Sequence, residues 1–285
     1  MLRKLRIVGA TLLASVFVLG VVDAQIRHTP SGCTDYVVGG PDIRPECETE
    51  SAATVRTVAE FTAANAEQLT AADADNLSFC AGQDCTVLAW FRHKSDTGID
   101  QFIFAKGNGF EYAAKADHSS SNFQPSLGAG AGGTCTGAAI AVDVAQTTTW
   151  HLGGVIYDHA DTSYQGYLDD VTATDASCEA NANQALDLWI GASDAAGNNL
   201  LDGYVGPIYA YTRKLTAGEL TILNAGTGTQ GLGCSELTGS LLTDLALCVP
   251  LQEVSGDRTA SALGSVGAIT FSDINTVTSA LWTVP

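Results

Sequence analysis

Two carboxylates that face one groove of a strand could cleave a glycosidic bond, one as the acid and the other as the nucleophile. The chain holds 31 Asp and Glu residues. On the expected strands, no Glu and Asp stand two residues apart, which is the spacing that would point both side chains to the same face. The sequence therefore argues against a glycan hydrolase.

Nucleophilic and zinc-dependent chemistry lack their usual signatures as well. The chain has no G-x-S-x-G stretch and no histidines at H-E-x-x-H or H-x-H spacing. His151 follows Trp150 at the start of an expected strand, which favours packing or a backbone hydrogen bond for this residue. We predict that the protein is not an enzyme.

Calcium is the metal that the acidic loops favour, because it takes several oxygen ligands from carboxylates and carbonyls. The loop 158–163 offers Asp158 and Asp161, and the loop 193–199 offers Asp194 and Asn198. The same residue types also form turns without any ion. Both interpretations stay open, with Asp158 and Asp161 as the expected calcium ligands and no other cofactor indicated.

The N-terminus has the pattern of an export signal. Arg3, Lys4 and Arg6 precede an apolar run over 7–22, and small residues follow at the positions of a cleavage site. The run is shorter than the roughly 20 residues that a membrane-spanning helix needs. We predict a signal peptide over 1–24 and a protein that is secreted or displayed on a cell or particle surface.

The charge balance excludes two classes of partner. Against its 31 acidic residues the chain has 13 Lys and Arg, for a net charge of -18 at pH 7. Nucleic acids and anionic lipids bind through Lys and Arg that displace counterions, and a strongly negative protein repels both. We predict no nucleic-acid binding and no direct membrane binding.

The chain contains eight cysteines, all after the predicted leader, and exported proteins oxidise such pairs. No paired C-x-x-C spacing indicates zinc. The sequence does not determine the connectivity, but short and turn-rich loops favour particular partners. The pairing we expect is Cys33–Cys47, Cys80–Cys85, Cys234–Cys248 and, from the two cysteines left over, Cys135–Cys178.

Short segments rich in Val, Ile, Thr and aromatic residues alternate with Gly, Asn and Asp along most of the chain, which predicts an all-β protein. The spacing suits an antiparallel two-sheet sandwich or jelly roll. One short helix is expected near 216–224, where Thr216 and Glu219 form a capping box and Gly226 follows the last turn. The segment 25–54, rich in proline and with two cysteines, is predicted to be a disulfide-tied extension.

The order of the segments resembles the laminin-G-like modules of the concanavalin A-like lectin and glucanase superfamily. The stretches that carry the resemblance include TVLAWFR (86–92), FIFAKGNGFEYAAK (102–115), TTWHLGGVIYDH (148–159), YQGYLDD (164–170) and LDGYVGPIYAYTRKLTAGELTILNAGTG (201–228). No single stretch is specific, but the ordered set covers about 55–230. The resemblance implies a jelly roll of two antiparallel sheets, one of them concave.

The C-terminal segment 231–285 resembles the opening of such a module rather than its end. It contains an apolar strand, then Glu253 before the Ser255–Gly256 turn, then a polar strand. A sheet that lacks an edge partner exposes unpaired backbone groups. We therefore predict that residues 245–281 supply the displaced opening strands, either within the same sandwich or in a neighbouring subunit.

The resemblance implies a non-catalytic module that binds glycan or surface protein through its loop rims. Asp161, Tyr164, Asp194 and Asn198 are the predicted ligand-binding residues. The alternative is a structural subunit of an extracellular fibre, virion or cell-surface assembly that polymerises by strand donation, which makes a homo-oligomer or fibre a possible state. Glycan binding also calls for an aromatic face, and strand aromatics are buried more often than exposed. The available ones are Tyr112, Tyr164, Tyr167, Trp189, Tyr204, Tyr209 and Tyr211.

Overall fold

The computed structural model describes residues 57–107, 111–129, 133–135, 138–141, 149–175, 178, 185–225, 232–252, 258–259 and 269–281. All of them belong to one compact unit, Arg56–Pro285. The predicted signal peptide, the extension 25–54, Glu253 and the Ser255–Gly256 turn lie outside the described residues. No helix among the described residues is long and apolar enough to cross a membrane.

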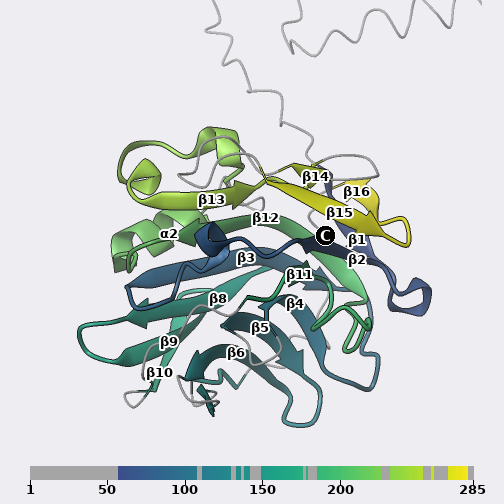
Figure 1. Cartoon of the computed structure of the whole chain (residues 1–285), viewed down its shortest axis with the longest axis horizontal. Coiled ribbons are helices and arrows are strands. Elements are labelled where there is room, and N and C mark those ends of the chain that lie inside the picture. The colour runs from purple at the N-terminus through teal and green to yellow at the C-terminus, as the bar shows by residue number, and fades with distance from the viewer. Residues whose placement is uncertain are drawn as a thin grey trace, which may run out of the picture. The chain divides into compact units, whose positions relative to one another are not determined.

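Two antiparallel sheets form the fold, as predicted (Figure 1). The first, called sheet A here, has the order β10-β9-β8-β3-β12-β1-β16, and β13 also pairs with β12. Its strands are β10 (Val171–Asp175), β9 (Ser163–Leu168), β8 (His151–Asp158), β3 (Cys85–His93), β12 (Gly203–Tyr211), β1 (Thr57–Phe61), β16 (Thr278–Leu281) and β13 (Leu245–Val249).

The second sheet, called sheet B, has the order β14-β15-β2-β11-β4-β5-β6-β7. Its strands are β14 (Arg258–Thr259), β15 (Thr270–Ile274), β2 (Gln68–Ala71), β11 (Leu188–Ile190), β4 (Gln101–Lys106), β5 (Tyr112–Asp117), β6 (Asn122–Ala129) and β7 (Gly133–Cys135). The α-helix in the described part of the chain is α2 (Ala217–Ala225), and short 3-10 turns lie at Ala63–Asn65, Asp75–Leu77, Cys234–Glu236 and Gly239–Leu242.

Strand β3 shows why the central strands read as nearly continuous apolar runs. Val87, Ala89 and Phe91 face the core between the sheets, and Leu88 and Trp90 face a second apolar cluster on the outer side of sheet A. Successive side chains of a strand point to opposite faces, so a strand covered on both sides is apolar at every position. Sheet A is therefore covered on its outer face along much of β3.

The C-terminal strands pair with the N-terminal part of the same chain. Strand β13 pairs with the second half of β12, β16 pairs with β1, and β15 pairs with β2. Figure 1 shows β15 and β16, at the yellow end of the colour range, beside the blue strands β1 and β2, and β13 beside β12. Strands β1 and β13 share one edge of β12, β1 along Gly203–Val205 and β13 along Ile208–Tyr211.

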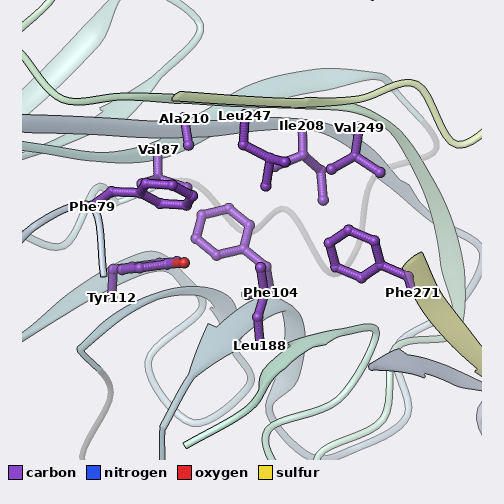
Figure 2. A pocket seen from close by; sticks show the side chains of 10 residues that line it. All are labelled: Phe79, Val87, Phe104, Tyr112, Leu188, Ile208, Ala210, Leu247, Val249 and Phe271. Atoms are coloured by element: carbon purple, nitrogen blue, oxygen red, sulfur yellow. The ribbon is translucent and has the colours of Figure 1, made fainter. Parts of the chain in front are cut away.

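The C-terminal strands also complete the core between the sheets. Leu247 and Val249 of β13 and Phe271 of β15 are buried there. Figure 2 shows Leu247 and Val249 pointing from one sheet towards Phe104 of the other, with Phe271 beside them. The cavity among these side chains has a volume of only about 10 Å³ and an entirely apolar lining. It is too small and too apolar to serve as a ligand pocket.

Glycines permit close approach of neighbouring strands in sheet A. A Cβ at Gly154 of β8 would lie 2.0 Å from the carbonyl oxygen of Val87 in β3, which is far inside van der Waals contact. The pair Gly154 and Leu88 is in register between β8 and β3. Any side chain at residue 154 would therefore push these two central strands apart.

Helix α2 starts as predicted. The backbone N–H of Thr216 donates to Glu219 Oε2 (2.9 Å), and the N–H of Glu219 donates to Thr216 Oγ1 (3.3 Å), which is a capping box. Arg213 adds a two-pronged ion pair, with Nη1 and Nη2 each 2.8 Å from a Glu219 carboxylate oxygen. The hydrogen bond from Arg213 lowers the pKa of Glu219 to about 2.

This pKa predicts acid sensitivity. A carboxylate whose pKa falls from 4.5 to about 2 on folding contributes stability above pH 4.5 and loses it between pH 4.5 and 2. Glu219→Gln should therefore lower the free energy of unfolding at pH 7 by on the order of 1–3 kcal/mol. Urea titrations from pH 7 to 2 should show the difference between the two proteins shrinking below pH 4.5. A constant difference down to pH 2 would contradict this role.

The structure confirms the predicted disulfides that fall on described residues. Cys80–Cys85, Cys135–Cys178 and Cys234–Cys248 have S–S distances of 1.99, 2.12 and 2.07 Å. The last of these joins the segment after helix α2 to β13, one of the C-terminal strands. Cys33 and Cys47 lie outside the described residues.

Candidate functional site

The predicted calcium ligands lie at the hairpin between β8 and β9. Asp158 Oδ1 accepts a hydrogen bond from the Asp161 backbone N–H (3.2 Å), and Asp158 Oδ2 contacts Lys214 Nζ (3.1 Å). The hydrogen bond from Lys214 is the main reason why the pKa of Asp158 is lowered. Within the described residues, no group of three or more His, Cys, Asp or Glu is placed to hold a metal. In the described structure Asp158 thus makes a turn hydrogen bond and an ion pair, and a calcium-binding role for Asp158 and Asp161 stays a prediction.

Tyr164 does not lie on the surface, so the prediction that it contacts a ligand is wrong. Its side chain has no exposed area, and its hydroxyl donates to the Pro125 carbonyl oxygen (2.7 Å). Burial raises the pKa of this hydroxyl. The prediction failed because Tyr164 follows a polar loop, whereas strand alternation turns it into the core.

Asp194 and Asn198 lie in the loop between β11 and β12 and bind each other. Both Asn198 N–H groups, backbone and side chain, reach the Asp194 carboxylate, as does the Ala196 backbone N–H. The same loop contacts the start of β4, because the Phe102 N–H donates to the Asn199 carbonyl (3.1 Å). These contacts make it a self-supporting turn at a loop rim.

The structure does not bring the two predicted ligand groups together. Asp161 follows the end of β8, where Tyr157 is in register with Cys85, the first residue of β3. The Asp194 loop leads to Gly203, which is in register with His93, the last residue of β3. Cys85 and His93 are the two ends of the nine-residue strand β3, so roughly 26 Å separates them at 3.3 Å per residue. One small ligand cannot contact both groups.

The aromatic residues considered for glycan contact differ sharply in exposure. Tyr112, Tyr164, Tyr167, Trp189, Tyr209 and Tyr211 are all buried. Tyr204 of β12 is the member of that set with a partly exposed side chain. A search for a sugar-stacking surface among these residues therefore leads to Tyr204.

Strand register places Tyr204 in a row of side chains on the outer face of sheet A. Tyr204 is in register with Glu60 of β1 on one side and with Arg92 of β3 on the other. Glu60 is in register with Thr278 of β16. Trp150 precedes His151, which pairs with Phe91, so it lies next to Arg92. We call these five residues the Tyr204 row; at 4.8 Å per strand the row spans roughly 20 Å.

The centre of the Tyr204 row alternates aromatic and cationic groups. The Arg92 guanidinium carbon lies 4.5 Å from the centroid of the Tyr204 ring and 5.4 Å from that of Trp150. The two ring centroids are 6.2 Å apart. Trp150 is only 8% exposed and packs against the outer apolar cluster of sheet A. The row thus sits at the margin of the covered part of this face, anchored by Trp150.

Lys94 connects the row to the loop rim. Its ammonium contacts Glu60 Oε1 (3.2 Å), Asp202 Oδ1 (3.6 Å) and Thr62 Oγ1 (3.3 Å), and it lies 5.6 Å from the centroid of the Tyr204 ring. Asp202 in turn accepts a hydrogen bond from Ser95 Oγ (2.5 Å) at the start of the loop between β3 and β4. The row is therefore continuous with the rim that carries Asp194 and Asn198.

This arrangement can contact a polar ligand that also has an apolar face. An aromatic side chain offers a flat apolar face, and the charged and hydroxyl groups beside it can fix the orientation of a polar ligand. Glu60, Tyr204 and Arg92 stand on strands that are paired on both sides. Such a surface is rigid, which lowers the entropy lost on binding.

The analysis of the sequence missed the Tyr204 row. Its members come from five places in the chain, and their proximity depends on strand order, which no local pattern reveals. One signal was present. In TVLAWFRH (86–93), Leu88, Trp90 and Arg92 lie on the outer face of the strand. The first two are apolar, so an arginine at the third position departs from the pattern.

A family model of the concanavalin A-like lectin/glucanases superfamily, of the laminin G type, matches residues 64–221, more than half of the chain. No curated protein matches this chain in sequence. A candidate carbohydrate-binding protein from Bacteroides ovatus has a similar structure, with a TM-score of 0.56 and 12% identity over 81% of this chain and 61% of that protein. This chain therefore spans about three fifths of that relative.

Weaker likenesses extend to a heptameric SAP-like pentraxin from Limulus polyphemus and to the CBM40 of a Ruminococcus gnavus sialidase. The pentraxin has a TM-score of 0.46 and 10% identity over 63% of this chain and 86% of its own. The CBM40 has a TM-score of 0.42 and 12% identity over 57% of this chain and 94% of its own. The match to the family model, together with the two-sheet topology, shows that the chain belongs to the concanavalin A-like lectin/glucanases superfamily.

Proposed function

We propose that this protein is a secreted, non-catalytic module that binds glycan, and that the Tyr204 row is its contact surface. The observation that carries the proposal is the placement of Tyr204, with a partly exposed side chain, in register between Glu60 and Arg92 on the outer face of sheet A. The ring supplies an apolar face, and its two neighbours supply hydrogen-bond acceptors and donors.

Several features support export and argue against other partners. Disulfides such as Cys135–Cys178 form in oxidising compartments. The net charge of -18 disfavours nucleic acid and anionic membranes. A glycan makes no demand on net charge, since its recognition depends on local stacking and hydrogen bonds.

Strand donation to a neighbouring subunit receives less support than glycan binding. It needs a vacant lane in the sheet, and in the described part of the chain β13, β15 and β16 occupy lanes beside β12, β2 and β1 of the same molecule. A fibre built by strand exchange would have to displace them. We therefore expect a concentration-independent monomer in light scattering.

Binding tests with Tyr204→Ala address the proposal directly. Removing the ring should weaken binding of the preferred glycan by about tenfold, because a stacked aromatic contact contributes about 0.5–1.5 kcal/mol beyond the area that it buries, and about 1.4 kcal/mol is a factor of ten. Tyr204→Phe, which keeps the ring, should retain most of the affinity. Isothermal titration calorimetry with the best ligand from a glycan array measures all three proteins.

Leu242→Ala is the matched control. Leu242 is an apolar residue with 43% of its surface exposed, and it lies in the 3-10 turn Gly239–Leu242, outside the Tyr204 row. Unchanged affinity in Tyr204→Ala would contradict the site. Release of reducing sugar by the wild-type protein would contradict the non-catalytic assignment.

A further inference from the structure

Arg92 differs from the other basic side chains that the structure describes. Each of the others contacts a carboxylate within 4 Å: Lys94 with Glu60, Lys106 with Asp73, Lys115 with Asp100, Arg213 with Glu219 and Lys214 with Asp158. Within the described part of the chain, Arg92 has aromatic contacts but neither an ion pair nor a hydrogen bond. In a protein with 31 acidic residues this is unexpected.

The surroundings of Arg92 fix its guanidinium without neutralising it. Its Nε atom is buried with no hydrogen-bond partner, while the side chain as a whole is partly exposed. The rings of Tyr204 and Trp150 hold the planar group through cation–π contacts. The nearest acidic member of the row, Glu60, is held by Lys94 instead. The terminal Nη groups are therefore left as free donors at the surface.

A carboxylate is the ligand group that matches such a site. A guanidinium presents parallel N–H donors that bind both oxygens of a carboxylate, and these charge-assisted bonds are roughly twice as strong as neutral ones. The two rings already order the arginine, so little side-chain entropy is lost on binding.

We propose that Arg92 binds the carboxylate of an acidic sugar whose ring packs against Tyr204. This inference rests on the proposed glycan-binding function and narrows its ligand class. It also accounts for the unpaired positive charge of Arg92, because the carboxylate of the ligand would neutralise it. Polyanions of high charge density are disfavoured by the net charge, whereas a single carboxylate placed at Arg92 is not.

A glycan array with neutral, carboxylated and sulfated members, probed with the full chain, tests the ligand class. Carboxylated glycans should give the strongest signals. Arg92→Gln should then lower the affinity for the best carboxylated glycan by about tenfold or more in calorimetry, and binding by the wild type should weaken as salt is raised. Arg92→Lys keeps the positive charge but not the paired N–H donors. Its affinity for the carboxylated glycan should therefore lie between those of the wild type and Arg92→Gln.

Lys115→Gln, on sheet B, is the matched control, because it removes a positive charge outside the Tyr204 row. Circular dichroism melting shows whether each variant is folded. Preference for neutral or sulfated glycans, or equal affinity in Arg92→Gln and the wild type, would overturn the role of Arg92 while leaving the glycan-binding function intact. Absence of binding to every class would overturn both proposals.

Discussion

A chain that ends at Asp244 should fail to fold. It lacks β13, β15 and β16, so β12 and β2 lose ladder partners and β1 becomes an open edge. It also lacks buried apolar side chains that the core needs: Leu245, Leu247, Val249, Phe271 and Val277. At about 1.5–3 kcal/mol for each such side chain, the loss approaches the whole stability of an ordinary domain.

Near-ultraviolet circular dichroism and urea titration measure this outcome. The truncated chain should carry Cys234→Ser, since its disulfide partner Cys248 is removed. A cooperative transition near that of the full chain would show that the C-terminal strands are dispensable. Addition of a peptide spanning 245–285 should restore the native signal if those strands complete the sandwich.

A permuted chain is the matched control. Thr57 of β1 is in register with Leu281 of β16, so the end of one strand lies beside the start of the other at an ordinary interstrand distance. A short turn can therefore join residues 232–281 to the front of residues 57–225. This chain contains the same strands in the order expected of the family, and it should fold with stability close to that of the natural order.

The second large effect is expected at Lys106, whose side chain is fully buried. Its ammonium contacts Asp73 Oδ1 (2.8 Å), the Leu186 carbonyl oxygen (2.7 Å) and, at 3.8 Å, the buried carboxylate of Glu111. Lys106→Ala would leave Glu111 buried without this cation. Removing one partner of a buried ion pair typically lowers stability by about 3–5 kcal/mol.

Urea unfolding at pH 7 gives the size of the effect. Lys115→Ala provides the comparison, because Lys115 and Asp100 form a partly exposed pair that should contribute about 1 kcal/mol or less. The double variant Lys106→Met with Glu111→Gln should recover part of the loss, because it removes both charges. Equal effects of Lys106→Ala and Lys115→Ala would show that burial does not set the strength of the Lys106 pair.

Local patterns predicted the features that depend on residues near one another in sequence. The capping box at Thr216 and the Cys80–Cys85 bridge each lie within six residues of chain, so spacing alone identifies them. The apolar run over 86–92 likewise predicted a strand, which the structure shows as β3 (Cys85–His93). Strand alternation and helix capping depend only on residues a few positions apart in the chain. They can therefore be predicted without a structure.

The ligand-binding residues could not be predicted in the same way. Tyr164 was predicted to bind ligand at a loop rim, but the exposure of its side chain depends on which face of β9 is buried. The Tyr204 row depends on β12 lying between β1 and β3, strands more than 100 residues before it. Strand order is set by the whole sandwich, so a site built across strands is invisible to local analysis.

The crystal structure of the protein with its best array ligand tests the central claim most directly. The account predicts a sugar ring against Tyr204 on the outer face of sheet A, with an acidic substituent at the terminal nitrogens of Arg92. A ligand bound instead at the Asp158–Asp161 hairpin, or on sheet B, would contradict it.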